Sequence, residues 1–259
     1  MSRINLANRL LNKVAVITAS TDGIGFAIAK RFAAEGAKII ISSRKQENVE
    51  NAVGRLKNDG FLDVIGVKCH VSIADDRKNL FAAAINNFGK IDILVSNAAC
   101  NPTVGSVLDC PEDAWDKIFD VNVKSSYLLA KEVAPILRKQ SSGSIIFVSS
   151  YAGLNPFPLL GAYSVSKTAL FGLTKALSQD LAPENIRVNC IAPGIIRTKF
   201  ARAMYESKAA EDMALSMIPM NRLGEVEDIS GIASFLASDD AAYITSETIV
   251  CAGGMPSRL

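Results

Sequence analysis

Tyr163 and Lys167 are the two residues whose types and spacing most directly suggest catalysis. Residues 162–181 have the pattern of a helix, and positions four apart on a helix lie on one face, one turn from each other. A phenol with a pKa of about 10 is mostly protonated at neutral pH. A neighbouring ammonium group stabilises the phenolate and is expected to lower that pKa. The pair therefore predicts an acid–base group that exchanges a proton with an alcohol or a carbonyl.

Two further polar residues support this prediction, which the common Y-x-x-x-K spacing alone would not carry. Ser150 follows a predicted strand at residues 144–149, and its hydroxyl could hydrogen-bond a substrate oxygen as charge develops there. Alternation along the strand turns the neighbouring Ser149 to the opposite face. Asn122 falls within a predicted helix at residues 111–138, where asparagine is disfavoured unless it has a function.

A glycine-containing segment after the first predicted strand, residues 14–18, suggests where a cofactor binds. Gly23 and Gly25 let the backbone approach a diphosphate at the start of a predicted helix, residues 24–35, where free amides and the helix dipole favour anions. Glycines in the context of strand, turn and helix predict a dinucleotide site. The segment reads Thr18, Ala19, Ser20, Thr21, Asp22, Gly23, Ile24, Gly25.

The end of the second predicted strand, residues 39–42, indicates which dinucleotide binds. Ser43 stands where an acid would bind a ribose 2′-hydroxyl, and Arg44 and Lys45 follow directly. A guanidinium group suits bidentate contact with a phosphate, so we predict NADP(H). The alternative is that Arg44 and Lys45 are merely solvent-exposed residues of a loop. Asp22 is placed to cap the first helix, and an acid at this position counts against the preference for NADP.

Composition excludes several other classes of function. A net charge of +2 and a pI of about 8.2 are too balanced for nucleic-acid binding. The five cysteines lack metal spacing and the single histidine is His70, so no metal site is expected. No apolar stretch is long enough to predict a membrane span.

The chain ends in Ser257, Arg258 and Leu259, a close variant of the S-K-L peroxisomal signal. This tripeptide predicts an import receptor as partner and the peroxisome as location. The alternative location is the cytoplasm.

The elements that must position these residues alternate along the chain. Short apolar runs and helical patterns predict a single α/β domain over residues 1–259, with a doubly wound, parallel, seven-stranded sheet of the Rossmann type. The remaining strands are expected at residues 64–68, 91–96, 186–191 and 248–251, and a kink is expected at Pro135. Residues 199–221, rich in Met and Ala, interrupt the alternation and are predicted to form a small helical lid over the site, or else an ordinary packed helical pair.

These motifs together resemble the short-chain dehydrogenase/reductase family over nearly the whole chain. Residues 18–25 resemble its T-G-x-x-x-G-x-G loop, with Ala19 at the first glycine; residues 97–99 resemble its N-A-G turn and residues 193–198 its P-G-x-x-x-T segment. The resemblance implies that Ser150 orients the carbonyl, Tyr163 protonates it, Lys167 lowers the tyrosine pKa and binds the nicotinamide ribose, and Asn122 holds a relay water. The residues expected at the cofactor are Thr18, Ala19, Ser20, Thr21, Gly23, Ile24, Gly25, Ser43, Arg44, Lys45, His70, Val71, Asn97, Ala98, Tyr163, Lys167, Pro193, Gly194, Ile196 and Thr198.

The first loop, the S-S-R-K and C-H-V stretches and the terminal S-R-L are similar to those of a peroxisomal, NADP-dependent branch of this family. That similarity implies a homotetramer that reduces bulky apolar ketones, aldehydes or α-dicarbonyls, retinal-like or aromatic. The residues expected at the substrate are Ser150, Phe157, Leu160, Tyr163, Phe200 and Met204. One alternative is a β-ketoacyl thioester reductase whose carrier binds Arg197, Lys199 and Arg202; another is a non-catalytic NADP-binding scaffold.

Overall fold

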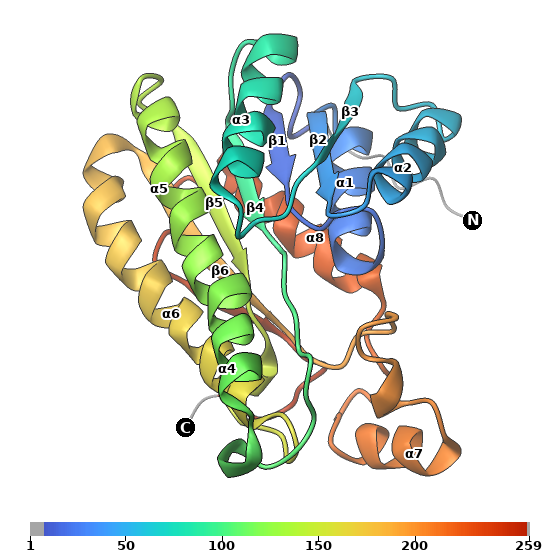
Figure 1. Ribbon diagram of the computed structural model, residues 1–259. Helices are drawn as coiled ribbons and strands as arrows, with labels where there is room; N and C mark the ends of the chain where they lie inside the picture. Colours follow the sequence, from blue (N-terminus) through green and yellow to red (C-terminus); the bar gives the residue numbers. More distant parts are fainter. Residues whose placement is uncertain (1–7, 258–259) are drawn as a thin grey trace.

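The computed structural model describes residues 8–257, in which seven parallel strands form one sheet (Figure 1). The strands are β1 Val14–Ile17, β2 Lys38–Ser43, β3 Val64–Lys68, β4 Ile93–Ser96, β5 Gly143–Val148, β6 Ile186–Pro193 and β7 Thr248–Cys251. Their order is β3-β2-β1-β4-β5-β6-β7, so the winding direction reverses between β1 and β4. The predicted doubly wound fold is confirmed, and the reversal point is where such sheets bind ligands.

Helices cover both faces of the sheet because the central strands are apolar on both sides. The helices are α1 Gly23–Ala34, α2 Gln46–Asn58, α3 Ala74–Phe88, α4 Glu112–Phe119, α5 Ser125–Arg138, α6 Gly161–Leu181, α7 Lys208–Ser216 and α8 Val226–Ala237. Ala15 and Ile17 belong to the core under α1, α2 and α8, whereas Val14 and Val16 belong to the core under α3, α5 and α6. Adjacent residues of one strand therefore pack into opposite layers.

The predicted long helix at residues 111–138 is interrupted, but not at the expected residue. A π-helical turn, Asp120–Lys124, separates α4 from α5, and Asn122 lies within it. Pro135 lies inside α5, which continues to Arg138. Because π turns are rare and concentrate at functional sites, the irregularity draws attention to Asn122.

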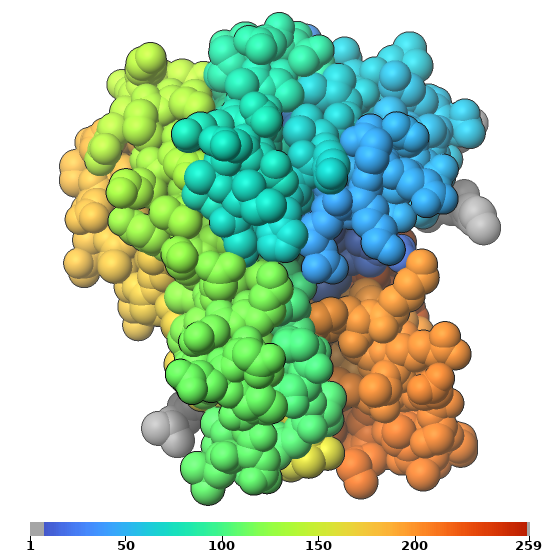
Figure 2. Space-filling model, in the orientation of Figure 1, coloured from blue at the N-terminus to red at the C-terminus, as the bar shows by residue number. Residues whose placement is uncertain are grey.

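Residues 199–221 form a short 3₁₀ turn, Arg202–Met204, followed by α7, which lies beyond the carboxyl ends of the strands (Figure 1). In the space-filling view this region forms the orange lobe at the lower right (Figure 2). The region encloses a small apolar cluster, here called the lid core, formed by Tyr151, Ile195, Ala214, Ile218, Leu223 and Met255. Residues 199–221 are therefore packed against the body of the protein, and their action as a mobile lid is a proposal.

Candidate active site

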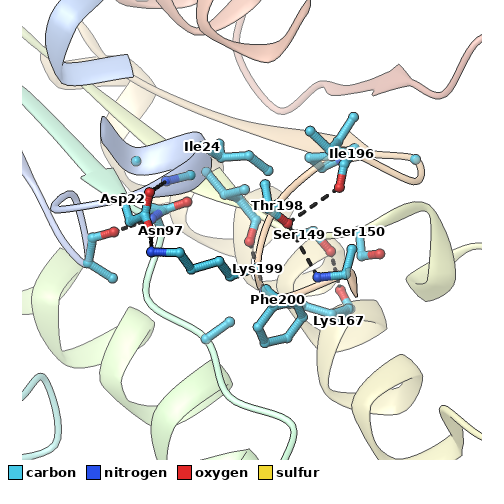
Figure 3. Close-up of a pocket in the computed structure, with 18 of the residues that line it drawn as sticks. Asp22, Ile24, Asn97, Ser149, Ser150, Lys167, Ile196, Thr198, Lys199 and Phe200 are labelled. Atoms are coloured by element: carbon cyan, nitrogen blue, oxygen red, sulfur yellow. Dashed lines mark hydrogen bonds and ion pairs between the residues drawn. The ribbon is translucent and has the colours of Figure 1, made fainter. Parts of the chain in front are cut away.

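A cavity of about 300 Å³ lies at the carboxyl ends of β1, β4, β5 and β6, where the sheet reverses its winding (Figure 3). Most of the residues predicted at the cofactor and at the acid–base pair lie around it. Its lining consists of Ala19, Asp22, Gly23, Ile24, Gly25, Asn97, Ala99, Val148, Ser149, Ser150, Tyr163, Lys167, Pro193, Gly194, Ile196, Thr198, Lys199, Phe200 and Ala201.

The glycine loop forms a cradle that only glycine permits. A Cβ atom on Gly25 would lie 2.5 Å from the carbonyl oxygen of Ala19 and 2.5 Å from Nδ2 of Asn97. Gly23 opens α1 with a φ of 55°, in the left-handed region. The first turn of α1 contains no acid, and the Asp22 side chain before it accepts a hydrogen bond from the N–H of Gly23 alone. These features fit the diphosphate of a dinucleotide.

Asn97 holds that loop in place from the next strand of the sheet. Its Nδ2 donates hydrogen bonds to the carbonyl oxygens of Thr18 and Ala19, both at 3.0 Å. In return, Thr18 Oγ1 accepts hydrogen bonds from the backbone N–H groups of Asn97 and Ala98, at 3.0 and 3.1 Å. The predicted N-A-G turn therefore supports the cradle, with Ala99 in place of glycine at the cavity wall.

Two residues expected at the cofactor point their side chains into the protein instead. Thr18 and Ser20 are fully buried. Ser20 Oγ donates to the carbonyl oxygen of Ile17 at 2.7 Å and accepts from the N–H of Ser42 at 3.0 Å. Neither residue lines the cavity, because their hydroxyl and backbone N–H groups are used to join β1 to its neighbouring strands.

The residues predicted to select NADP lie outside this cavity, at the ends of β2 and β3. Arg44 and Lys45 are exposed, and within residues 8–257 neither forms an ion pair with an acid. His70 accepts a hydrogen bond at Nδ1 from the N–H of Ser72 at 3.3 Å. Burial, and then the charges of Lys117 and Arg44, hold the pKa of His70 below its ordinary value, so the imidazole is neutral at physiological pH. Ser43, Thr21 and Val71 likewise do not line the cavity.

Tyr163 and Lys167 lie on one face of α6, and both are buried. Lys167 Nζ donates to the carbonyl oxygen of Val148 at 2.9 Å and lies 5.6 Å from the centre of the Tyr163 ring. Burial raises the pKa of Tyr163 to about 12, although the Ser150 hydroxyl acts in the opposite direction. Burial also lowers the pKa of Lys167 to about 8. Burial is the largest cause of both shifts, and the expectation that Lys167 stabilises the phenolate of Tyr163 stays a prediction.

The two serines after β5 have different partners, as strand alternation predicts. Ser149 Oγ donates to the carbonyl oxygen of Lys167 at 2.7 Å and is used in packing α6 against the sheet. Ser150 Oγ accepts a hydrogen bond from the N–H of Ala152 at 3.1 Å. That bond leaves the Ser150 proton available to donate to a substrate oxygen beside Tyr163.

Asn122 is buried and all of its side-chain bonds are made within the protein. Its Oδ1 accepts from the N–H of Cys100 at 2.8 Å, and its Nδ2 donates to the carbonyl oxygen of Cys100 at 3.1 Å and to Ser166 Oγ at 3.0 Å. The amide thus joins the π turn both to the residue after the N-A-A turn and to α6, next to Tyr163. Its role in holding a relay water stays a proposal, and its side chain is not free to bind one.

Of the apolar residues predicted at the substrate, only Phe200 lines the cavity. Its ring centre lies 5.8 Å from that of Tyr163. Phe157 and Met204 pack against the lid core, and Leu160 lies on another face, beside residues 103–110. These three side chains do not line this cavity, because proximity to Tyr163 in the chain does not determine which way a loop side chain turns; their contact with a substrate stays a prediction.

The cavity also contains residues that the sequence did not assign to it. Val148, Ser149 and Ala201 are neighbours of predicted positions, so only their place in space identifies them. Asp22 and Lys199 form an ion pair of 2.7 Å across the cavity wall (Figure 3). The position of Lys199 directly after the P-G-x-x-x-T segment was the one sequence feature that could have predicted this contact.

Metal binding and membrane spanning find no support in the part of the chain that is described. Residues 8–257 contain no group of three or more His, Cys, Asp or Glu side chains placed to hold a metal ion. Nor does this range include a helix with both the length and the hydropathy needed to cross a bilayer.

Comparisons with known proteins agree with this geometry. A family model described as enoyl-(acyl carrier protein) reductase matches residues 18–256. The chain is 54% identical to rabbit (Oryctolagus cuniculus) dehydrogenase/reductase SDR family member 4 over 258 residues, covering 100% of this chain and 99% of the relative. It is also 54% identical to the human protein of that name over 96% of this chain and 90% of the relative.

Solved structures show the same fold. A protein described as a short-chain alcohol dehydrogenase from Sinorhizobium meliloti superposes with a TM-score of 0.90 at 33% identity, covering 96% of this chain and 98% of the other. One described as a gluconate dehydrogenase from Agrobacterium tumefaciens gives 0.92 at 26% identity, covering 98% and 100%. The predicted resemblance is confirmed by the Rossmann-type sheet, the dinucleotide cradle and the full-length relatives. Together they identify the protein as an oxidoreductase that uses a nicotinamide cofactor, and the chain belongs to the short-chain dehydrogenase/reductase family.

Proposed function

We propose that this protein is an NADPH-dependent carbonyl reductase acting on bulky apolar ketones, aldehydes or α-dicarbonyls, with Ser150, Tyr163 and Lys167 as its catalytic residues and Asn122 supporting them. The observation that carries the proposal is the buried Tyr163 hydroxyl, which lies beside the Ser150 hydroxyl in a cavity that the glycine cradle also lines. A phenol whose pKa is raised to about 12 is fully protonated at neutral pH, which suits a proton donor in the reductive direction.

When bound, NADPH supplies the hydride that reduces the carbonyl carbon. The Ser150 hydroxyl donates a hydrogen bond to the carbonyl oxygen and stabilises the negative charge that forms there. Tyr163 donates its proton to that oxygen, so the product is the neutral alcohol. Lys167, fixed by the Val148 carbonyl, keeps a positive charge near the phenol and stabilises the phenolate that the transfer leaves.

The preference for NADP is supported by the end of β2. Arg44 is exposed and has no acidic partner within residues 8–257, so its guanidinium group is free to form a bidentate contact with a 2′-phosphate. Changing Arg44 to Ser should raise the Kd for NADPH roughly tenfold or more and leave that for NADH within about twofold. Tighter binding of NADH than NADPH by the unchanged protein would contradict the preference.

The apolar substrate class is supported by the walls beside Tyr163. Phe200 is 58% exposed and stands over the phenol, with Val148, Ile196 and Ala201 nearby. A panel of carbonyl compounds assayed by NADPH oxidation should show higher kcat/KM for aromatic ketones and dicarbonyls than for small charged keto acids. Strong preference for the charged acids would overturn this assignment.

The thioester alternative loses its supporting feature in the structure. Arg197 pairs with Glu211, Arg202 with Glu206 and Lys199 with Asp22, so the three bases do not form an unpaired patch for a phosphorylated carrier. Parallel turnover of a β-ketoacyl-CoA and an aromatic dicarbonyl separates the two candidates. Absence of turnover on every carbonyl, with dinucleotide binding retained, would favour the non-catalytic scaffold.

Peroxisomal location and a homotetramer complete the proposal and rest on the resemblance to the peroxisomal branch. The tail up to Pro256 is held in place, because the Tyr151 hydroxyl donates to the Pro256 carbonyl at 2.8 Å; Arg258 and Leu259 lie outside the described residues. A fluorescent fusion at the N-terminus should colocalise with peroxisomes and become cytoplasmic when Ser257, Arg258 and Leu259 are removed. Light scattering on the purified protein should give four times the 27.6 kDa chain mass.

A further inference from the structure

Asp22 is an unexpected residue in a site for an anionic cofactor. It is the only acid among the described residues that line the cavity. Its Oδ1 accepts a hydrogen bond from the N–H of Gly23 at 3.0 Å and so caps α1 at the end where a diphosphate would approach. Left alone, this carboxylate would occupy one amide donor and repel the phosphates.

Lys199 lies beside that carboxylate. Its Nζ is 2.7 Å from Asp22 Oδ2, and this hydrogen bond is the main reason why the pKa of Asp22 lies below its ordinary value. The preceding residue, Thr198, lies close to Gly23, since its methyl carbon is 3.4 Å from the position that a Cβ of Gly23 would occupy. The only other base in the lining, Lys167, is buried and bonded to Val148. Lys199 is therefore the cation that faces Asp22 across the wall (Figure 3).

We propose that Lys199 supports cofactor binding indirectly: it neutralises Asp22, so that the diphosphate of a nicotinamide dinucleotide can bind at the start of α1. The inference rests on the dinucleotide site and not on the preference for NADP, because NAD and NADP carry the same diphosphate. It changes the interpretation of Lys199, which the sequence grouped with Arg197 and Arg202 as a carrier patch.

A purely structural role for the pair predicts a different result. Lys199 is 89% exposed and the Asp22 side chain 54% exposed, and ion pairs of this kind contribute little to stability. Removing the lysine should therefore change cofactor affinity and leave the thermal midpoint nearly unchanged. Lys208 offers a matched control, since it is 79% exposed and pairs with Asp212 at 2.8 Å on α7, away from the cavity lining.

The test compares Lys199→Met, Asp22→Asn, the double variant and Lys208→Met. NADPH and NADH are titrated by nucleotide fluorescence at about 20 mM salt, where screening is weak. We expect Lys199→Met to raise both Kd values roughly three- to tenfold, an effect that shrinks at higher salt. Asp22→Asn keeps a side-chain cap and should bind at least as tightly as the unchanged protein, and the double variant should match Asp22→Asn. Lys208→Met should leave both values unchanged.

Two results would overturn the inference. One is an unchanged Kd for Lys199→Met. The other is that Lys199→Met costs the same affinity in the Asp22→Asn variant as in the unchanged protein, because Lys199 would then act on the cofactor without neutralising the acid. Failure of the proposed function would look different, since a preference for NADH or inactivity toward carbonyls leaves these ratios of Kd values intact.

Discussion

Gly25→Ala is the substitution that tests the cofactor cradle most sharply. The added methyl group would lie 2.5 Å from the Ala19 carbonyl oxygen, 2.5 Å from Asn97 Nδ2 and 2.9 Å from the Ser20 Cα, all of them parts of a fixed hydrogen-bonded loop. Overpacking of this kind costs about 1–3 kcal/mol. If the loop moves to relieve it, that free energy must be restored for the cofactor to bind, which corresponds to a rise in Kd of roughly 5- to 140-fold.

The assay is titration of NADPH with the purified variant, beside thermal unfolding without cofactor. Gly172→Ala is the matched control, because a Cβ at that position on α6 meets nothing within 4 Å. That control should keep its affinity and gain roughly 0.5–1 kcal/mol of stability from the lower chain entropy of alanine. NADPH binding by Gly25→Ala that equals the control's would refute the cradle, and with it the placement of the diphosphate at α1.

Two further predictions concern the scaffold around the site. Ala19 has a φ of 48°, in the left-handed region that alanine adopts only with strain. Ala19→Gly should therefore raise the free energy of unfolding by roughly 0.5–1 kcal/mol without weakening NADPH binding. A lower midpoint in denaturant would show that the left-handed turn carries no strain. Glu35 is buried and bonded to Arg9, Arg31 and Ser234, so Glu35→Gln should destabilise the protein by on the order of 3 kcal/mol at neutral pH. Burial acts to raise the Glu35 pKa, but these partners together hold it below its ordinary value. The stabilisation by Glu35 is therefore present above that ordinary value and lost as pH falls. A stability–pH curve of Glu35→Gln as steep as that of the unchanged protein between pH about 5 and 2 would count against this role.

Much of the fold was predictable because the information is local. The continuous apolar runs of β1, β2 and β4 predict strands buried on both faces, and Gly23 and Gly25 occur directly after the first of them. The predicted strand bounds differ from those observed by at most two residues. The acid–base pair was predictable for the same reason, since one helical turn determines how Tyr163 and Lys167 are spaced.

The remaining features depend on contacts between distant segments. Asn122 lies in a π turn whose position is set by bonds to Cys100 and Ser166, and neither partner is near it in sequence. Phe157 and Met204 pack against the lid core, whose members come from segments as far apart as Tyr151 and Met255. Burial raises the pKa of Tyr163, and residue spacing does not reveal that burial. Ser20 is similar, since its hydroxyl is used between β1 and β2.

The central claim, that Tyr163 is the proton donor, is tested most directly by single-turnover reduction of an aromatic dicarbonyl by Tyr163→Phe saturated with NADPH. The phenylalanine keeps the ring that packs 5.8 Å from Phe200 and removes only the hydroxyl beside Ser150. We expect a rate lower by roughly 10²–10⁴-fold, with the Kd for NADPH within about twofold of that of the unchanged protein. Tyr151→Phe, which loses a hydroxyl bonded to the Pro256 carbonyl outside the cavity lining, is the matched control. A Tyr163→Phe enzyme that reduces the carbonyl as fast as this control would contradict the claim.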